Sequence, residues 1–364
     1  MYEKEELRFE IEEPKNIEEV DKELRRFLEL QKARVKVFGV GGGGNNTLAR
    51  MMEVGIKGAD MIAVNTDAQD LLYTTASAKI LIGKELTFGL GAGSNPKVGF
   101  DAAKESESEI RKRIQGANLV FITCGLGGGT GTGAAPVIAE VAKKAGILTI
   151  AVVTLPFTIE GKRRWENAML GLERLEDLVD TLIVIPNDKL LELAPDLPLQ
   201  TAFKVADEIL TNAVKGITEL ITSPGLVNVD FADIKTVMTN AGVAMIGVGE
   251  SDSKHRAKEA IEKAINNPLL DIDIEGSSGA LVNIVGGKDM SLEEAKEVIE
   301  YVSSKLDSDA KFIWGASLSP DMGANLRVML IMTGVKSPQI FGALAAREER
   351  EKGAANELGI EFID

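Results

Sequence analysis

Seven consecutive residues, Gly127-Gly128-Gly129-Thr130-Gly131-Thr132-Gly133, comprise five glycines and two threonines. Glycine lets the backbone approach an anion closely, because no Cβ atom stands in the way. A helix that begins directly behind such a loop points free N–H groups and the positive end of its dipole at the anion. Thr130 and Thr132 add hydroxyl donors. A simple turn does not need five glycines, each of which raises the entropy lost on folding, so the run predicts a phosphate-binding loop.

Two further glycine-rich segments follow short apolar runs. Gly41-Gly42-Gly43-Gly44-Asn45-Asn46 comes after the run 35–40, and Gly89–Pro96 comes after the run 80–82. If these runs are parallel strands, all three segments lie at carboxyl strand ends, where open α/β sheets bind their ligands. Three such loops from one sheet fit a triphosphate better than a single anion.

The first glycine run also allows a different interpretation. Gly39, Gly41 and Gly44 match the G-x-G-x-x-G spacing of dinucleotide sites, and Asp67 follows the next strand, where such a site needs an acidic residue. A dinucleotide-dependent oxidoreductase therefore stays open at this point, although it leaves the other two loops unexplained. A Walker P-loop is excluded, because no glycine run is followed by Lys-Ser or Lys-Thr.

Phe203 and Asp207 lie four residues apart in a strongly helical segment, so one helix face presents both an aromatic ring and a carboxylate. The ring can stack on a base. The carboxylate suits guanine, which offers two N–H donors on one edge, whereas adenine offers no such pair there. The alternatives are core packing for Phe203 and a solvated surface charge for Asp207.

Asp230 and Asp233 occur in the segment Asn228-Val-Asp-Phe-Ala-Asp233. Their spacing predicts a helix start, with Asp230 as N-cap and Asp233 at the third helical position. This structural role is compatible with a chemical one, because it leaves two carboxylates at an exposed helix end.

The elements that position these residues form an α/β pattern. Strands predicted at 35–40, 61–64, 80–82, 119–123, 148–153 and 181–185 are interspersed with helices at 47–55, 97–115 and 134–145. Such alternation predicts a Rossmann-like parallel sheet covered on both faces. Residues 201–222 have apolar positions at the 3.6-residue period and predict a long central helix of about 33 Å.

A second block follows, with strands at 244–249, 279–286, 311–316 and 325–334 and helices at 253–266 and 292–306. It predicts a smaller C-terminal α/β domain with a mixed sheet. The expected organisation is a charged extension (1–33), a first domain that includes the central helix (34–222), the smaller domain (223–335), and a linker with a tail (336–364).

Composition narrows the function. The 364 residues carry 41 Lys and Arg against 56 Asp and Glu, a formal charge of −15, which disfavours nucleic-acid binding. A single cysteine, Cys124, and a single histidine, His255, exclude a disulfide framework and a Cys/His zinc site. We expect a buried thiol and a surface imidazole. No apolar run approaches the roughly 20 residues of a membrane span, and the acidic N-terminus is unlike a targeting signal, so we expect a cytoplasmic protein without direct membrane insertion.

The combination of motifs resembles the tubulin/FtsZ family, and FtsZ more than tubulin. The resemblance rests on Gly127–Gly133, Gly41–Asn46, Asn65-Thr-Asp67, Gly89–Pro96 and 228–233, and it extends over roughly 35–335. The long charged extension and the short linker are more similar to archaeal than to bacterial members. The resemblance implies a self-assembling GTPase of cell division, which forms head-to-tail filaments at midcell. A nucleotide-binding scaffold that neither polymerises nor turns over GTP is the alternative within the same fold.

The resemblance also implies which residues bind GTP or GDP. Phosphate contacts fall to the first and third loops, and the second loop is expected to sense the terminal phosphate through Ala92 and Gly93. Glu160 and Arg164 hold the ribose, Phe203 stacks on the base, Asp207 reads guanine, and Asn187 assists. The complete expected set is Gly41, Gly42, Gly43, Gly44, Asn45, Asn65, Asp67, Ala92, Gly93, Gly127, Gly128, Gly129, Thr130, Gly131, Thr132, Gly133, Glu160, Arg164, Asn187, Phe203 and Asp207.

Catalysis is implied to come from Asp230 and Asp233, together with Asn228, which enter the neighbouring subunit's pocket and position the attacking water. Mg²⁺ on the phosphates would offset the repulsion between these acids and the triphosphate, with Asp67 as a water-mediated contact. The tail Leu358–Asp364 has four apolar residues after a charged linker. We expect it to bind an adaptor protein at the membrane.

Overall fold

The computed structural model describes residues 21–22, 33–193, 198–222, 225–227, 229–267, 277–306 and 309–335. Met1–Ala33 and Arg34–Asp364 are separate units, and the account below concerns the second. Asn228, the linker and the tail lie outside the described residues, as does nearly all of the N-terminal extension.

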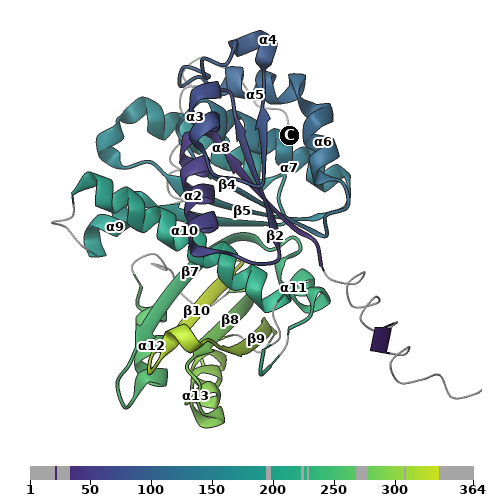
Figure 1. Cartoon of the computed structure of the whole chain (residues 1–364). Helices are drawn as coiled ribbons and strands as arrows, with labels where there is room; N and C mark the ends of the chain where they lie inside the picture. The colour runs from purple at the N-terminus through teal and green to yellow at the C-terminus, as the bar shows by residue number, and fades with distance from the viewer. Residues whose placement is uncertain are drawn as a thin grey trace, which may run out of the picture. The chain divides into compact units, whose positions relative to one another are not determined.

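Ten strands form one sheet in the order β3-β2-β1-β4-β5-β6-β7-β10-β8-β9 (Figure 1). Neighbours from β3 to β7 are parallel, as are β8 and β9, whereas β10 runs antiparallel to both β7 and β8. The predicted parallel sheet with a smaller mixed region is confirmed. The strands are β1 Val35–Val40, β2 Ala59–Asn65, β3 Ala78–Leu81, β4 Leu119–Gly125, β5 Leu148–Leu155, β6 Thr181–Pro186, β7 Gly242–Ser251, β8 Gly279–Gly286, β9 Lys311–Leu318 and β10 Leu326–Thr333.

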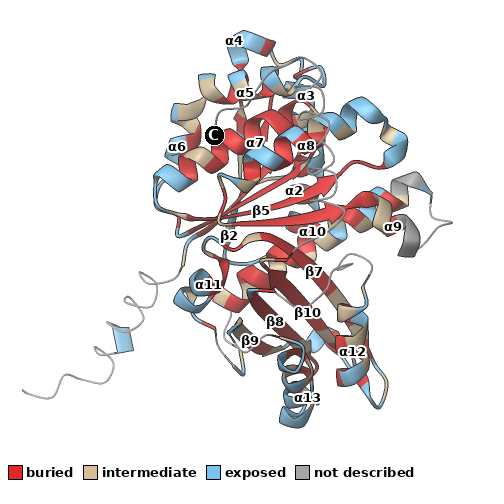
Figure 2. Cartoon of the chain, turned by 180° about the vertical axis from the view of Figure 1, so that it is seen from behind, coloured by how far each residue is buried: buried red, intermediate tan, exposed pale blue. Residues whose placement is uncertain are grey.

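The two regions expected as separate domains share this sheet. β6 pairs with β7 from Thr181 opposite Gly242 to Ile183 opposite Ala244, so the first region continues directly into the second. β5 and β6 are buried along their whole length, because helices cover both faces of a parallel sheet (Figure 2).

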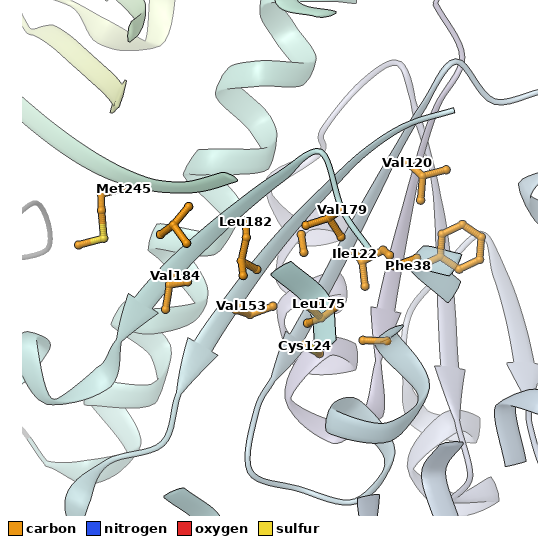
Figure 3. Packing of buried hydrophobic residues seen from close by; sticks show 14 of the residues in the cluster. Phe38, Val120, Ile122, Cys124, Val153, Leu175, Val179, Leu182, Val184 and Met245 are labelled. Atoms are coloured by element: carbon orange, nitrogen blue, oxygen red, sulfur yellow. The ribbon is translucent and has the colours of Figure 1, made fainter. Parts of the chain in front are cut away.

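Alternate residues of each strand face two different hydrophobic clusters. In β4, Val120, Ile122 and Cys124 join a cluster with α5, α6, α7 and α8 (Figure 3), whereas Leu119 and Phe121 join one with α2, α3, α10 and α11. This period of two is the signature of a strand packed on both sides. The helices are α2 Gly41–Val54, α3 Ala68–Tyr73, α4 Lys84–Thr87, α5 Pro96–Glu105, α6 Glu107–Ile114, α7 Thr130–Lys144, α8 Lys162–Glu176, α9 Asn187–Leu193, α10 Leu199–Thr222, α11 Phe231–Met238, α12 Arg256–Ile265 and α13 Leu292–Ser303. Short 3₁₀ turns cover Thr158–Glu160 and Pro320–Met322.

Two helix predictions need correction. The segment predicted as one helix over 97–115 is divided at Ser106, whose φ of −99° and ψ of 13° interrupt the helix. The Ser106 hydroxyl accepts a hydrogen bond from the Gly83 N–H at 3.1 Å, so it serves a neighbouring turn. The first glycine run is not a loop before a helix at 47, because α2 begins at Gly41 itself.

α10 is the central helix and spans 24 residues. Its buried residues Leu210, Val214 and Ile217 belong to the same cluster as α2 on one side and β8 and β10 on the other, so this helix joins the two regions of the sheet (Figure 1). Gly216 allows the close approach, since a Cβ there would lie 2.4 Å from Cε of Met329.

Both single-copy residues lie where the sequence predicts. Cys124 is fully buried, and burial raises the pKa of its thiol to about 12. His255 is exposed just before α12. Among the described residues, no helix is long and apolar enough to cross a bilayer.

Candidate nucleotide-binding site

A cavity of about 680 Å³ opens at the carboxyl ends of β1, β4 and β5. It brings together twelve of the predicted residues, which come from the first and third loops, the start of α8, α9 and α10. They are Gly41, Gly42, Gly43, Gly128, Gly129, Thr130, Gly131, Glu160, Arg164, Asn187, Phe203 and Asp207.

Two helices begin at this cavity with unsatisfied N–H groups. Neither α2 nor α7 has a side-chain N-cap, and neither has an acidic residue in its first turn. The two helix starts touch, because a Cβ on Gly41 would lie 2.9 Å from the Gly131 nitrogen. Gly41 also has φ +71°, which favours glycine. Free amides and two converging helix dipoles make this a site for a polyanion.

Part of the third loop shapes the cavity from behind. The Thr132 hydroxyl accepts a hydrogen bond from the Gly127 N–H at 2.9 Å, and the Thr130 and Thr66 hydroxyls lie 2.6 Å apart. Gly133 permits close packing against α5, since its Cβ would lie 2.0 Å from the Pro96 oxygen. Gly127, Thr132 and Gly133 therefore support the loop without lining the cavity.

The asparagines behind the first loop are held by a residue that the sequence reasoning missed. Asp70 Oδ2 accepts hydrogen bonds from the amide of Asn65 at 2.6 Å and from the amide of Asn45 at 3.2 Å. Asp70, in α3, thus links α2 to the end of β2. Its position close behind Asn65-Thr-Asp67 was the available signal. Gly44 has a packing role, because its Cβ would lie 2.3 Å from the Thr123 oxygen.

Asp67 caps α3 with its side chain. Its Oδ1 accepts hydrogen bonds from the N–H groups of Gln69 at 2.9 Å and Asp70 at 3.0 Å. Its Oδ2 faces the second loop, where a Cβ on Gly91 would lie 3.7 Å away. Asp67 is outside the lining of the cavity.

The second loop lies beside the third. Gly129 faces it so closely that a Cβ there would lie 2.8 Å from Cβ of Ala92 and 2.8 Å from the Asn95 nitrogen. Ala92 is buried, whereas Gly93 is exposed and has φ +57°. Neither residue lines the cavity itself, so the second loop lies behind the third loop without enclosing the cavity.

Glu160, Arg164 and Phe203 form the opposite wall. Glu160 pairs with Arg164 and accepts a hydrogen bond from the Phe157 N–H at 2.9 Å. The Phe203 ring packs edge-on against Phe157, with ring centroids 5.1 Å apart, and stays 40% exposed. Phe203 is therefore a fixed aromatic surface and not a core residue, as base stacking requires.

Asp207 and Asn187 supply acceptors beside this ring. Burial raises the pKa of Asp207, while the Thr47 hydroxyl, 2.6 Å away, and the charge of Arg50 lower it. Asp207 is thus not a solvated surface charge. Asn187 is buried, and its Oδ1 has no partner within the described structure. A buried amide oxygen without a partner fits a ligand that donates N–H groups.

Several lining residues were not predicted. Thr47 follows the first loop on the face of α2 that meets Asp207. Exposed Lys204 and buried Ala206 lie next to Phe203 and Asp207 on α10. Helical spacing around Phe203 and Asp207 could have identified the last two. The full set of missed lining residues is Val40, Asn46, Thr47, Gly125, Leu126, Thr154, Pro156, Lys204, Ala206 and Leu210.

Asp230 and Asp233 form the predicted helix start. Asp230 Oδ1 accepts a hydrogen bond from the Asp233 N–H at 2.8 Å, and Asp233 Oδ2 accepts one from the Asp230 N–H at 3.3 Å. Both residues are exposed. α11 is attached at the amino end of β6, where the Thr181 hydroxyl donates to the Met238 oxygen at 2.5 Å. The two acids therefore lie away from the cavity, which opens at the carboxyl ends of the strands.

A parallel α/β sheet with glycine turns, two uncapped helix starts and an aromatic ring beside a buried carboxylate defines a nucleotide-binding protein. Comparison with known proteins makes the class specific. Residues 34–195 match the GTPase domain of the tubulin/FtsZ family, and residues 242–336 match the C-terminal domain of the FtsZ family. The chain belongs to the FtsZ family of cell-division GTPases, and the dinucleotide interpretation of Gly39, Gly41 and Gly44 is wrong.

Relatives and solved structures agree with this assignment. The chain is 62% identical over 333 residues to cell division protein FtsZ 1 of Thermococcus kodakarensis, covering 92% of this chain and 88% of the relative. It is 59% identical over 351 residues to cell division protein FtsZ 1 of Archaeoglobus fulgidus, covering 96% and 94%. An empty FtsZ dimer from M. jannaschii superposes with a TM-score of 0.83 at 60% identity, covering 86% of this chain and 92% of that one. A GTPγS-bound protofilament of CetZ2 from Haloferax volcanii shares the fold, with a TM-score of 0.74 at 21% identity, covering 88% and 99%.

Proposed function

We propose that this chain assembles head to tail and hydrolyses GTP at the joint between two copies, where one copy supplies the nucleotide cavity and the next supplies Asp230 and Asp233. The observation that carries this proposal is their separation. The cavity opens at the carboxyl end of the sheet, whereas α11 is attached at the amino end.

The acids inside the cavity are already engaged on its base and ribose side. Glu160 pairs with Arg164, and Asp207 accepts from Thr47. Two exposed carboxylates on the neighbouring copy can orient and polarise a water next to the terminal phosphate, so that catalysis depends on position and charge. The FtsZ dimer from M. jannaschii and the CetZ2 protofilament support self-association.

The residues of this site fit a Mg²⁺ ion that is held mainly by the nucleotide phosphates and by water. The described residues contain no group of three His, Cys, Asp or Glu side chains able to hold a metal ion. Mg²⁺ commonly binds substrate phosphates, several waters and one or two carboxylates, which this site can accommodate. Asp67 Oδ2, beside the second loop, would contact the ion through water, and the ion would neutralise phosphate charge.

The cellular setting is part of the same proposal. We expect the chain to act in the cytoplasm at the midcell division site, with the tail Leu358–Asp364 bound to a membrane adaptor. The support is the apolar character of Leu358, Ile360, Phe362 and Ile363 after a charged linker. A pull-down of adaptor that is unchanged when these seven residues are deleted would remove this part of the proposal.

The decisive test combines concentration dependence with complementation. GTP turnover per subunit should rise with protein concentration, and a constant rate at all concentrations would refute a shared site. Asp233→Ala keeps the cavity but lacks an acid. Gly128→Asp keeps the acids. A Cβ at this position would meet no atom within 4 Å, and the added carboxylate would place a negative charge in the cavity, where the phosphates are proposed to bind.

Each variant alone should be inactive. Mixed in equal amounts, they should regain part of the turnover, because some joints pair an intact cavity with intact acids. A mixture that stays as inactive as its components, although the two variants coassemble, would show that one chain supplies both halves of the site.

A further inference from the structure

Asn167 of α8 connects two of the three glycine loops. Its amide nitrogen Nδ2 lies 3.2 Å from the Ser94 oxygen in the second loop and 3.3 Å from the Gly127 oxygen in the third loop. One amide nitrogen has two hydrogens, so it can donate to both carbonyls at once. Asn167 does not line the nucleotide cavity.

The third loop is fixed on α8 at the point where Asn167 binds it. A Cβ on Gly127 would lie 2.8 Å from the Arg164 oxygen, so the backbones of α8 and the loop are in contact. Gly127 also donates its N–H to Thr132. Because Arg164 lines the cavity, α8 connects the side of the cavity proposed to hold the sugar with the back of the third loop.

The second loop depends more than the third loop on the contact with Asn167. Ser94 has φ +58°, a left-handed conformation that is unfavourable for a residue other than glycine and needs support from its surroundings. The adjacent Gly93 has open space around it, because a Cβ added there would meet no atom within 4 Å. The Asn167 amide is therefore a restraint on the part of the second loop that carries Gly93.

We propose that Asn167 is a positioning residue that holds the second loop against the third so that the protein distinguishes a nucleoside triphosphate from a diphosphate. The proposal rests on the proposed function in one respect, GTP binding in this cavity, and on the role in sensing the terminal phosphate that the family resemblance implies for Ala92 and Gly93. A diphosphate needs only the amides of the first and third loops. The terminal phosphate additionally needs the second loop in place.

Substitutions at Asn167 test this role. Asn167→Leu removes both donors at similar volume, and Asn167→Asp keeps the shape but turns the donors into acceptors that repel both carbonyls. Glu166→Ala is the matched control, because Glu166 is exposed on the same helix and pairs only with Lys162, at 3.6 Å, among the described residues. Affinities for GDP and for the β,γ-imido analogue of GTP are measured by titration below the concentration of assembly.

Both Asn167 variants should bind GDP within about twofold of the parent and the imido triphosphate about three- to tenfold more weakly, as expected for the loss of hydrogen bonds that hold one loop. Equal weakening of both nucleotides would mean a merely structural role, and unchanged affinity for both would also overturn the proposal. Either variant alone suffices if the other fails to fold.

Because this measurement uses isolated subunits, it is independent of Asp230 and Asp233. Failure of the shared-site proposal would leave the ratio of the two affinities interpretable, and failure here would leave the complementation result unaffected.

Discussion

The two roles of Asp230 and Asp233 can be separated by measuring stability and turnover together. Replacing the Asp230 side chain with alanine removes an N-cap bond of 2.8 Å to the Asp233 N–H. Such a loss costs about 1 kcal/mol. The reciprocal bond from Asp233 is longer, at 3.3 Å, and exposed, so Asp233→Ala should cost less, about 0.5 kcal/mol. Both costs are small beside the roughly 5–15 kcal/mol that stabilises a folded domain.

The effect on turnover should be far larger. A carboxylate that orients or deprotonates the attacking water contributes about 10²–10⁴-fold to the rate. We therefore expect Asp233→Ala to melt within a few degrees of the parent, to bind GTP normally, and to lose at least about 100-fold in turnover. Thermal melting, nucleotide titration and phosphate release at a fixed protein concentration measure the three quantities.

Asp230→Ser is the matched control for the cap. Serine accepts the same N–H bond without the charge, so this variant should keep the melting temperature that Asp230→Ala loses. If turnover falls equally in Asp230→Ser and Asp230→Ala, the carboxylate is needed for chemistry. If turnover instead falls only in the variant that loses melting temperature, and stays within twofold of the parent in Asp233→Ala, both acids have only structural roles.

Other perturbations address the base, the first loop and the C-terminal region. Asp207→Asn should weaken GTP binding about 10- to 100-fold, because a charged acceptor of two N–H groups becomes an amide, and XTP should then compete better than GTP. Burial raises the Asp207 pKa above its usual 3.8, so GTP affinity in the parent should decline as pH falls through that raised value, and this decline should be absent in Asp207→Asn. Asp70→Ala frees the amides of Asn45 and Asn65 and should weaken binding of GDP and GTP alike, by titration, about three- to tenfold. Arg256→Ala leaves Glu294 without its bidentate partner and should lower the free energy of unfolding by about 3 kcal/mol without altering nucleotide affinity, as denaturation and titration would show.

The sheet was predictable because its strands are continuous apolar runs. The apolar segment 119–123 had to be a buried element, and the strand in the structure continues only two residues further, to Gly125. The glycine run 41–44 misled the helix prediction, because glycine disfavours helices in general. Here the α2 start needs backbone without side chains, so the anion site overrides that propensity. The short helices α3 and α9 have too few residues to show a period.

The site was predictable where residue type alone restricts the chemistry. The spacing of Phe203 and Asp207 predicted one shared helix face, and both residues line the cavity. The spacing alone left core packing and a solvated charge open. The contact between Asn45, Asn65 and Asp70 was not predictable in this way, because it depends on how α2 and the turn after β2 approach each other. The same holds for Asn167, whose two acceptors come from segments 73 and 40 residues away in sequence.

The connectivity of the chain supports the proposal that one copy does not complete its own site. In a parallel sheet every glycine loop after a strand falls at the carboxyl end. α10 begins at that end, where Phe203 lines the cavity. Its last residue, Thr222, lies against Gly58, which comes just before β2 at the amino end of the sheet. Its 24 residues span about 36 Å, and the chain reaches Asp230 only after that crossing. The cavity and the acids are thus on opposite ends of one subunit. Two different surfaces that meet between copies form a heterologous contact, and repetition of that contact without closure produces an open filament.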